Sequence, residues 1–140
     1  MKYDDASWHY GGDFPEDLPE EAGATHIGMF VAWALLSGLA GPIHTEEFPE
    51  ELDALKHRQI RPGQFFLGNC DGKFTDEDLN PLGNEFARTY FETSEYLVDY
   101  DEVLGSDLPS LYHVEDSWEN YDRLRPCLDQ RFAAWNRERT

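Results

Sequence analysis

The sequence predicts a mainly α-helical fold, a single compact domain built around one buried central helix. Residues 25–39 contain no Asp, Glu, Lys or Arg, and their apolar side chains wrap the whole helical cylinder, which is typical of a buried helix. Other stretches carry apolar residues at helical spacing between Pro and Gly breaks. With 140 residues, 40% of them apolar, the chain can bury one substantial core.

The N-terminal residues 3–15 are predicted to form a lid of irregular chain over the central helix, with or without a short strand. They mix aromatic residues with Asp and His and show neither helical nor strand periodicity. Gly11 and Gly12 indicate a turn, and Pro15 and Pro19 keep the following residues extended. We therefore expect at most a minor β element here.

The ends of the central helix are marked by Thr25 at its start and by Gly38 or Gly41 at its end. The Thr25 hydroxyl is predicted to cap the first turn, and Pro42 prevents continuation. A membrane span is the alternative, but the run is long enough only if Gly38, Gly41 and Pro42 are included, and no basic flank follows. We expect a core helix and no membrane partner.

Three shorter helices are predicted next, over residues 48–59, 62–70 and 81–92. Pro49 is tolerated only in a first turn, so the first of them starts at about residue 48, and its buried face is predicted to carry Phe48, Leu52 and Leu55. The second begins at Arg61-Pro62 and ends at Asp71-Gly72, and the third has the stronger start, with Asn80 as cap and Pro81 in the first turn.

The remaining signals are more varied. Residues 75–78 form another capping-type start, and residues 94–104 are compatible with either strand or helix. Ser117 is predicted to cap the last helix, and Pro126 should kink that helix or split it in two. One face of this helix is predicted to carry Trp118, Tyr121, Leu128, Phe132 and Trp135.

The formal net charge of −18 limits the partners that this chain can have. Such a field repels phosphate backbones, so nucleic acids and anionic membranes are disfavoured. It favours a basic protein partner, or else it serves only solubility. The first residues lack the basic and apolar regions of a signal peptide, so we expect a cytoplasmic protein.

Cys70 and Cys127 are the two thiols of the chain. Their spacing matches no metal motif, and in a reducing cytosol they are expected to stay free, although a disulfide remains open. Neither has a context that would lower a thiol pKa, and no Gly-x-Ser-x-Gly elbow or phosphate-binding loop occurs. The sequence therefore predicts no catalytic residue, no cofactor and no enzyme.

A group of Asp and His residues gathers near the N-terminus and at the start of the central helix. Carboxylate and imidazole groups suit divalent metals or acid–base chemistry, but this spacing matches no metal motif. The favoured interpretation is structural, with these side chains bonding backbone donors and His26 to fix the lid, and without a metal. This lid cluster comprises Asp4, Asp5, Trp8, His9, Asp13 and His26.

A calcium loop is the other metal pattern to consider. Asn69, Asp71, Gly72 and Asp78 fall at its third, fifth, sixth and twelfth positions. Leu67 stands at the first position and cannot ligate, and the twelfth position lacks the bidentate Glu. We therefore predict a helix-ending turn instead.

Clusters of acidic residues interspersed with aromatic rings suggest a docking face for a basic protein, with rings as anchors and carboxylates raising the association rate. The alternative is a solvated surface whose aromatic residues, Phe74 and Tyr112 among them, belong to the core. The predicted face comprises Glu46, Glu47, Glu50, Glu51, Asp76, Glu77, Asp78, Tyr96, Asp99, Tyr100, Asp101 and Glu102.

Several strings of the sequence resemble a family of small uncharacterised bacterial proteins. These are YDDASWHYGGDFP at 3–15, GATHIGMF at 23–30, LYHV at 111–114 and WENY at 118–121. Members of this family resemble immunity proteins, the cytoplasmic inhibitors that bacteria pair with secreted antibacterial toxins such as those of type VI secretion. The resemblance implies tight binding to one toxin domain and carries no enzymatic motif.

The leading hypothesis is an immunity protein that occludes the active site of a basic toxin domain acting on nucleic acid. A metal-dependent enzyme using Asp4, Asp5, His9, Asp13 and His26 is the second hypothesis, and a phosphate-mimicking decoy for a nucleic-acid-binding protein is the third. The sequence leaves open the toxin's identity, the acidic face that binds it and the oligomeric state.

Overall fold

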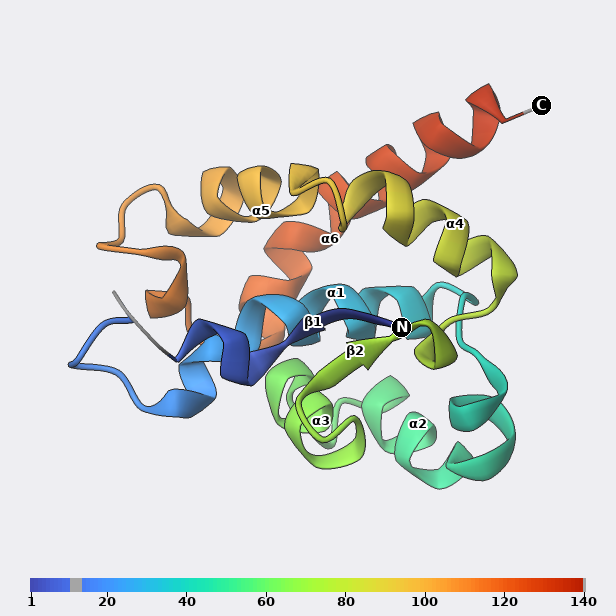
Figure 1. The fold of residues 1–140 in the computed structure, drawn as a ribbon, viewed down its shortest axis with the longest axis horizontal. Coiled ribbons are helices and arrows are strands. Elements are labelled where there is room, and N and C mark those ends of the chain that lie inside the picture. Colours follow the sequence, from blue (N-terminus) through green and yellow to red (C-terminus); the bar gives the residue numbers. More distant parts are fainter. Residues whose placement is uncertain (11–13, 140) are drawn as a thin grey trace.

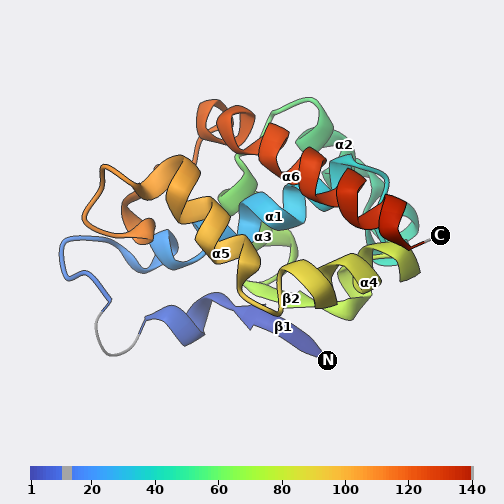
Figure 2. The ribbon, with the colours of Figure 1, turned by 90° about the horizontal axis from the view of Figure 1, so that it is seen from above.

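The computed structural model describes residues 1–10 and 14–139 and has a mainly helical architecture (Figures 1 and 2). The helix α1 lies in the middle, with a small sheet, two shorter helices and the C-terminal half of the chain packed around it. The strands are β1 (Lys2–Asp5) and β2 (Lys73–Thr75). The helices are α1 (Thr25–Leu36), α2 (Pro49–Lys56), α3 (Pro62–Asn69), α4 (Pro81–Tyr90), α5 (Glu95–Tyr100) and α6 (Trp118–Glu138).

The central helix is confirmed, because every residue of α1 except Leu36 is buried. Its predicted cap is wrong. The preceding residue, Ala24, already has near-helical dihedral angles, and the helix follows a 3₁₀ turn at Glu20–Gly23, so Thr25 lies inside the first turn and is buried. Gly38 ends the helix as predicted, with a φ of +83° and the Leu39 N–H donating to the Ala34 carbonyl at 3.0 Å.

A two-stranded antiparallel sheet is the minor β element near the N-terminus. Asp4 of β1 pairs with Phe74 of β2, and Asp5 pairs with Lys73. The second strand was not predicted. It forms because Asp71 and Gly72, both with positive φ, turn the chain back sharply after α3.

The predicted starts of α2 and α4 are confirmed. Pro49 occupies the first turn of α2, and the Asn80 side chain caps α4 by accepting a hydrogen bond from the Gly83 N–H at 2.8 Å. Phe48, however, does not lie on the buried face of α2 and is 44% exposed. A π-helical turn at Ile43–Glu47 precedes it and directs its ring to solvent, whereas Leu52 and Leu55 are buried as expected.

The C-terminal half is helical. Residues 95–100 form α5, which continues into a π-helical turn at Asp101–Gly105. Ser117 caps α6, and this helix runs through Pro126 as one element, so of the two predicted outcomes, a kink or a split, the split does not occur. Buried residues lie on both sides of the proline, Tyr121 and Leu124 before it and Leu128 after it, so both parts of the helix pack against the core. None of the helices in the described part of the chain has the length and apolar composition that a membrane span requires.

Candidate functional site

The lid cluster begins where β1 ends. Asp5 caps a 3₁₀ turn at Ala6–His9, its carboxylate accepting hydrogen bonds from the Ser7 N–H at 2.9 Å and the Ser7 hydroxyl at 2.8 Å. It also pairs with Lys2 at 2.7 Å. Burial by itself would raise the pKa of the Asp5 carboxyl, but the bonds from Lys2 and Ser7 outweigh burial and lower that pKa to about 2. Asp5 thus remains ionised and fixes the turn that carries His9.

This turn brings Asp4, His9 and His26 together. The His9 Nε2 lies 2.9 Å from the Asp4 Oδ1, and the His26 Nε2 lies 3.9 Å from the Asp4 Oδ2. The two imidazole rings meet edge to face with centroids 4.6 Å apart. The Tyr112 hydroxyl lies 2.7 Å from the His9 Nδ1, and the Asp5 N–H donates to the Asp4 Oδ1 at 2.8 Å. The N-terminal segment and the segment that contains Tyr112, which are far apart in sequence, therefore meet at the start of α1.

His26 stands out in this group because it is only 1% exposed and neither ring nitrogen has a hydrogen-bond partner among the described residues. Burial lowers the pKa of His26 to about 3, the nearby His9 adds to this effect, and Asp4 opposes it. The imidazole is therefore neutral at physiological pH. The hydroxyl of Tyr100, whose ring centroid lies 6.1 Å from that of His26, also lacks a partner in the described part of the structure.

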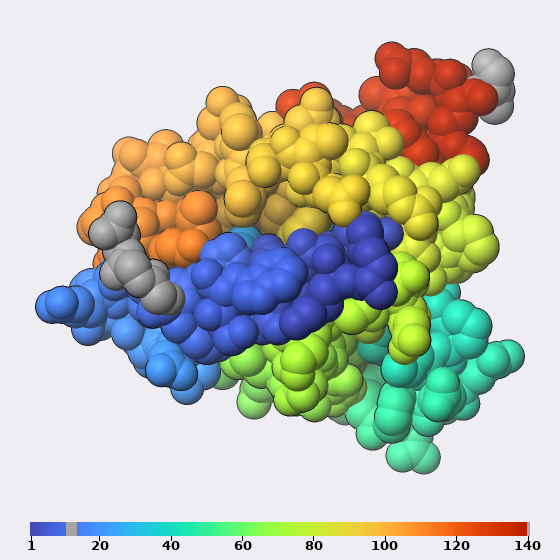
Figure 3. All heavy atoms as spheres, in the orientation of Figure 1, coloured from blue at the N-terminus to red at the C-terminus, as the bar shows by residue number. Residues whose placement is uncertain are grey.

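The structure brings some residues of the predicted lid cluster together and separates others from it. The N-terminal segment lies across the visible face of the molecule in Figure 3, with His9 in ring contact with His26 of α1, and Asp4 and Asp5 bond backbone N–H groups as expected. The predicted hydrogen bond to His26 is not made. Trp8 does not join the cluster, since it is 58% exposed, with the Lys2 ammonium 5.1 Å from its ring centroid. Asp13 lies outside the described residues.

A second polar group, not predicted, is formed by His44, Cys70 and Asp78. The His44 Nε2 lies 2.8 Å from the Asp78 Oδ1, and the Cys70 thiol donates to the same oxygen at 3.8 Å. The Asp78 Oδ2 accepts the Thr75 N–H at 2.9 Å and so closes a capping box. Burial, together with Asp78, raises the pKa of the Cys70 thiol, which makes it unreactive. Of the residues that suggested a calcium loop, Asn69 ends α3, and Asp71 and Gly72 form the turn after it, as predicted, whereas Asp78 lies in the 3₁₀ turn at Asp76–Asp78.

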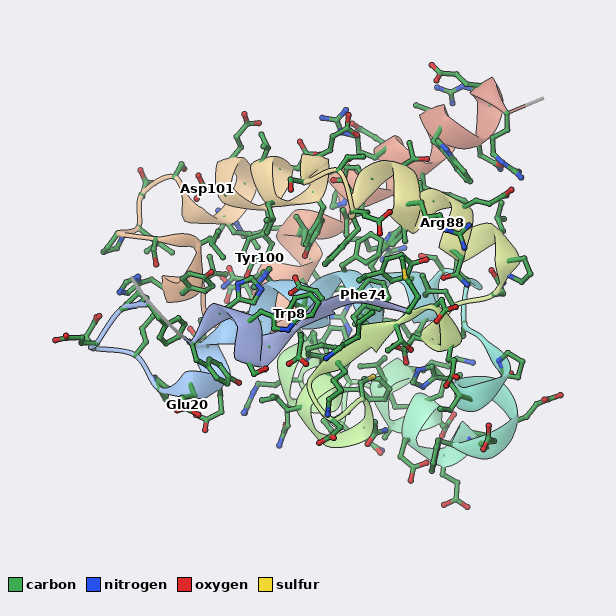
Figure 4. All side chains as sticks on the ribbon, viewed as in Figure 1. Trp8, Glu20, Phe74, Arg88, Tyr100 and Asp101 are labelled. Carbon is green, nitrogen blue, oxygen red and sulfur yellow. The ribbon has the colours of Figure 1, made fainter. Side chains whose placement is uncertain are left out.

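The predicted docking face is wrong in four of its members, because Asp78, Tyr96, Asp99 and Tyr100 are buried. Asp78 is held by the capping box and by His44, and Asp99 accepts hydrogen bonds from Arg131 and Tyr90. Figure 4 shows Tyr100 pointing from α5 toward α1, whereas Asp101 lies on the outer side. Phe74 is likewise a core residue.

Most of the remaining acidic residues of the predicted face fall into two groups, one on each side of α1 in both views (Figures 1 and 2). Each contains an exposed apolar side chain, Phe48 in the first and Val98, 57% exposed, in the second. We call the first group the Phe48 patch and the second the Val98 patch. The Phe48 patch consists of Glu46, Glu47, Phe48, Glu50 and Glu51, and the Val98 patch of Glu95, Val98, Asp101 and Glu102. Asp76 and Glu77 lie apart from both, beside the N-terminus, where Asp76 pairs with the Met1 ammonium at 3.2 Å.

A cavity of about 490 Å³ opens between the 3₁₀ turn before α1, the start of α3 and residues 112–116. It is lined by Thr25 and by Tyr112, whose hydroxyl contacts His9, so it lies beside the lid cluster. On its other side Asp116 accepts hydrogen bonds from the Gly63 N–H at 2.8 Å and the Gln64 N–H at 3.1 Å, at the start of α3. The N-terminus of α3, where an external anion could otherwise bind, is therefore already occupied by the Asp116 carboxylate.

Comparison with known proteins gives a family match over most of the chain. One family model, described as a domain of unknown function (DUF7832), matches residues 2–114, a span that includes both polar groups and ends before α6. Neither a curated protein nor a solved structure matches the chain. The match covers well over half of the sequence, and the chain belongs to the DUF7832 family.

Proposed function

We propose that this protein is an immunity protein, a cytoplasmic inhibitor that binds one secreted antibacterial toxin domain and occludes its active site. The observation that carries the proposal is Phe48, a large apolar ring held in solvent and bordered in the chain by Glu46, Glu47, Glu50 and Glu51. A basic toxin that acts on nucleic acid has a surface that receives phosphate, and the carboxylates of the Phe48 patch complement that surface.

The backbone around Phe48 is well fixed. The Phe48 N–H donates to the Ile43 carbonyl at 3.1 Å, and the Phe48 carbonyl accepts from the Leu52 N–H at 3.2 Å. Pro49 also restricts the backbone of Phe48, because a proline limits the conformations of the residue before it. A ring that is already ordered loses little conformational entropy on binding, and buried aromatic residues are the usual energetic centre of protein interfaces. Phe48 therefore has the properties of an anchor, and the surrounding charge accelerates encounter.

The inhibitor mechanism is steric and electrostatic and involves no turnover. Phe48 inserts into an apolar part of the toxin surface, while the patch carboxylates take the positions of substrate phosphates. The charge of −18 makes the association rate fall steeply with added salt, whereas dissociation depends mainly on the apolar contact.

The test uses the full chain and the C-terminal domain of a large secreted protein encoded beside it. Binding kinetics are measured at several salt concentrations, together with inhibition of the toxin's activity on nucleic acid. Phe48→Ser is expected to weaken binding about 100-fold or more, and Glu47→Lys to slow association about 10-fold at low salt. Both variants should keep the wild-type melting temperature, because both side chains are exposed.

Val98→Ser is the matched control, since it also replaces an exposed apolar residue in an acidic patch. It should bind like wild type. Failure of the two proteins to associate at low salt would count against the inhibitor function. Loss of binding in Val98→Ser with normal binding in Phe48→Ser would contradict the assignment of the docking surface.

A further inference from the structure

We propose that Asp4, His9 and His26 bind one divalent transition-metal cation of the Zn²⁺ class, which fastens the N-terminal segment to α1. This inference does not depend on the proposed function. Two imidazoles and one carboxylate form a donor set that suits Zn²⁺ and neighbouring first-row cations. The three side chains come from β1, the turn after it and α1, so the cation would cross-link the N-terminal segment to the central helix.

The donor atoms are close to the required positions. One ligand atom from each residue lies within 4.8 Å of the other two. Ligands bonded to zinc at about 2.0–2.2 Å stand about 3–4 Å apart. The His9 Nε2 lies 2.9 Å from one Asp4 oxygen and the His26 Nε2 lies 3.9 Å from the other, so both imidazoles face the same carboxylate at distances close to this range.

The unpartnered ring nitrogens of His26 provide the independent observation. A buried polar group without a hydrogen bond is costly, and native structures contain few of them. Coordination through the Nε2, which lies 3.9 Å from the Asp4 carboxylate, would remove this cost at that nitrogen.

Hydrogen bonds from neighbouring groups hold two of the proposed ligands, as is usual for the ligands of a metal ion. The Tyr112 hydroxyl at 2.7 Å from the His9 Nδ1 fixes that ring, and the Asp5 N–H at 2.8 Å fixes the Asp4 carboxylate. Asp4 also supplies negative charge to offset the cation.

The second polar group, His44 with Cys70 and Asp78, is a less suitable site, although its donor atoms lie as close together. Both oxygens of Asp78 already accept hydrogen bonds, from His44 and from the Thr75 N–H, so a cation there would have to break the capping box. Its Cys70 thiol also resists deprotonation, because its pKa is raised.

The experiment titrates Co²⁺ and then Zn²⁺ into the full chain after treatment with a chelator. Co²⁺ absorption reports coordination number and ligand type, calorimetry gives stoichiometry, and the melting temperature reports stabilisation. We expect one equivalent to bind, without thiolate-to-metal absorption, and excess Zn²⁺ to raise the melting temperature. Asp4→Asn and His9→Gln should weaken binding about 100-fold and Tyr112→Phe about 10-fold.

Two control variants locate the cation. His113→Gln changes a histidine that bonds Ser110 and Asp17, and Cys70→Ser changes the second polar group, and both should bind Co²⁺ like wild type. Wild-type protein that neither changes the Co²⁺ spectrum nor melts higher with Zn²⁺ would overturn the proposal, whatever the variants do. Absorption from a thiolate ligand that disappears in Cys70→Ser would overturn it too.

Discussion

Gly28 of α1 lies directly against Gly63 of α3, and the two backbones leave no space for a side chain between them. A Cβ atom added at Gly28 would stand 2.8 Å from the Gly63 Cα and 2.8 Å from the Pro62 carbonyl oxygen. Glycine inside a helix costs about 0.5–1 kcal/mol relative to alanine, so a structural gain must offset it. That gain is the close contact of the central helix with α3, its most extensive packing partner.

Gly28→Ala is expected to destabilise the protein by about 2–4 kcal/mol, because the two helices must separate to admit a methyl group. Gly68→Ala is the matched control. It lies near the end of α3, where an added Cβ meets nothing within 4 Å, and it should stabilise the protein by about 0.5–1 kcal/mol. Urea denaturation measures both, and equal stability of the two variants would contradict the packing described.

Asn80→Ala should cost about 1–2 kcal/mol, because α4 then loses its cap. The Asn80 side chain accepts from the Gly83 N–H at 2.8 Å and donates to the Gly38 carbonyl at 3.1 Å, so it also ties α4 to the end of α1. Thr89→Ala serves as the control on the exposed face of the same helix, and it should be neutral or slightly stabilising. Thermal unfolding distinguishes the two, and a neutral Asn80→Ala would show that the cap is dispensable.

Asp99 is expected to make stability depend on pH. Arg131 donates to its carboxylate at 2.8 and 2.9 Å, and the Tyr90 hydroxyl donates at 2.6 Å. Burial alone would raise the pKa of Asp99, but the bonds from Arg131 and Tyr90 outweigh burial and hold that pKa below its ordinary value of 3.8. As the pH falls through this range, the unfolded chain binds a proton before the folded chain does. The stability that Asp99 contributes is therefore present at neutral pH and lost in acid.

Asp99→Asn should lower the free energy of unfolding at pH 7 by about 2 kcal/mol and flatten its decline as the pH falls below the ordinary carboxyl pKa of 3.8. Arg131 is half exposed, so screening keeps the effect below that of a fully buried pair. Asp122→Asn removes the exposed ion pair with Arg58 and should cost less than about 1 kcal/mol. The same loss at neutral pH in both variants would contradict the special role of Asp99.

Cys70 is expected to react slowly with alkylating agents in the folded protein. Burial raises the pKa of its thiol, and Asp78 adds to the shift, so little thiolate forms at pH 8. Cys70 and Cys127 are both free, so reducing agents should leave the melting temperature unchanged. Mass spectrometry of iodoacetamide-treated protein should show Cys70 labelling at least about 10-fold slower than in urea. Equal rates would mean that the thiol is accessible.

Much of the fold could be predicted because the signals are local. A run without charges predicted α1, and Pro49, Asn80, Gly38 and Ser117 marked helix ends correctly, since turn and capping residues act over one helical turn. The cap at Thr25 was wrong because a 3₁₀ turn runs directly into the helix. The sequence predicted that Asp4, His9 and His26 form one group. It did not predict that both ring nitrogens of His26 lack a hydrogen-bond partner, because that depends on how deeply the N-terminal segment buries this residue.

The composition of the acidic surface was the least predictable feature. Phe48 was assigned to the core and is exposed, whereas Tyr96 and Tyr100 were assigned to the surface and are buried. An aromatic residue between carboxylates gives the same sequence pattern whether its ring is buried or exposed. Its orientation follows from the local backbone and from which side of its segment packs against the core.

The sequence by itself determined the central helix, most helix ends and the large negative charge, because each follows from residue types over a few positions. Only the tertiary structure decided which acids are buried and which face solvent. A carboxylate can be buried only where a donor reaches it, and the donors of Asp78 and Asp99 include His44 and Arg131, which lie 34 and 32 positions away along the chain.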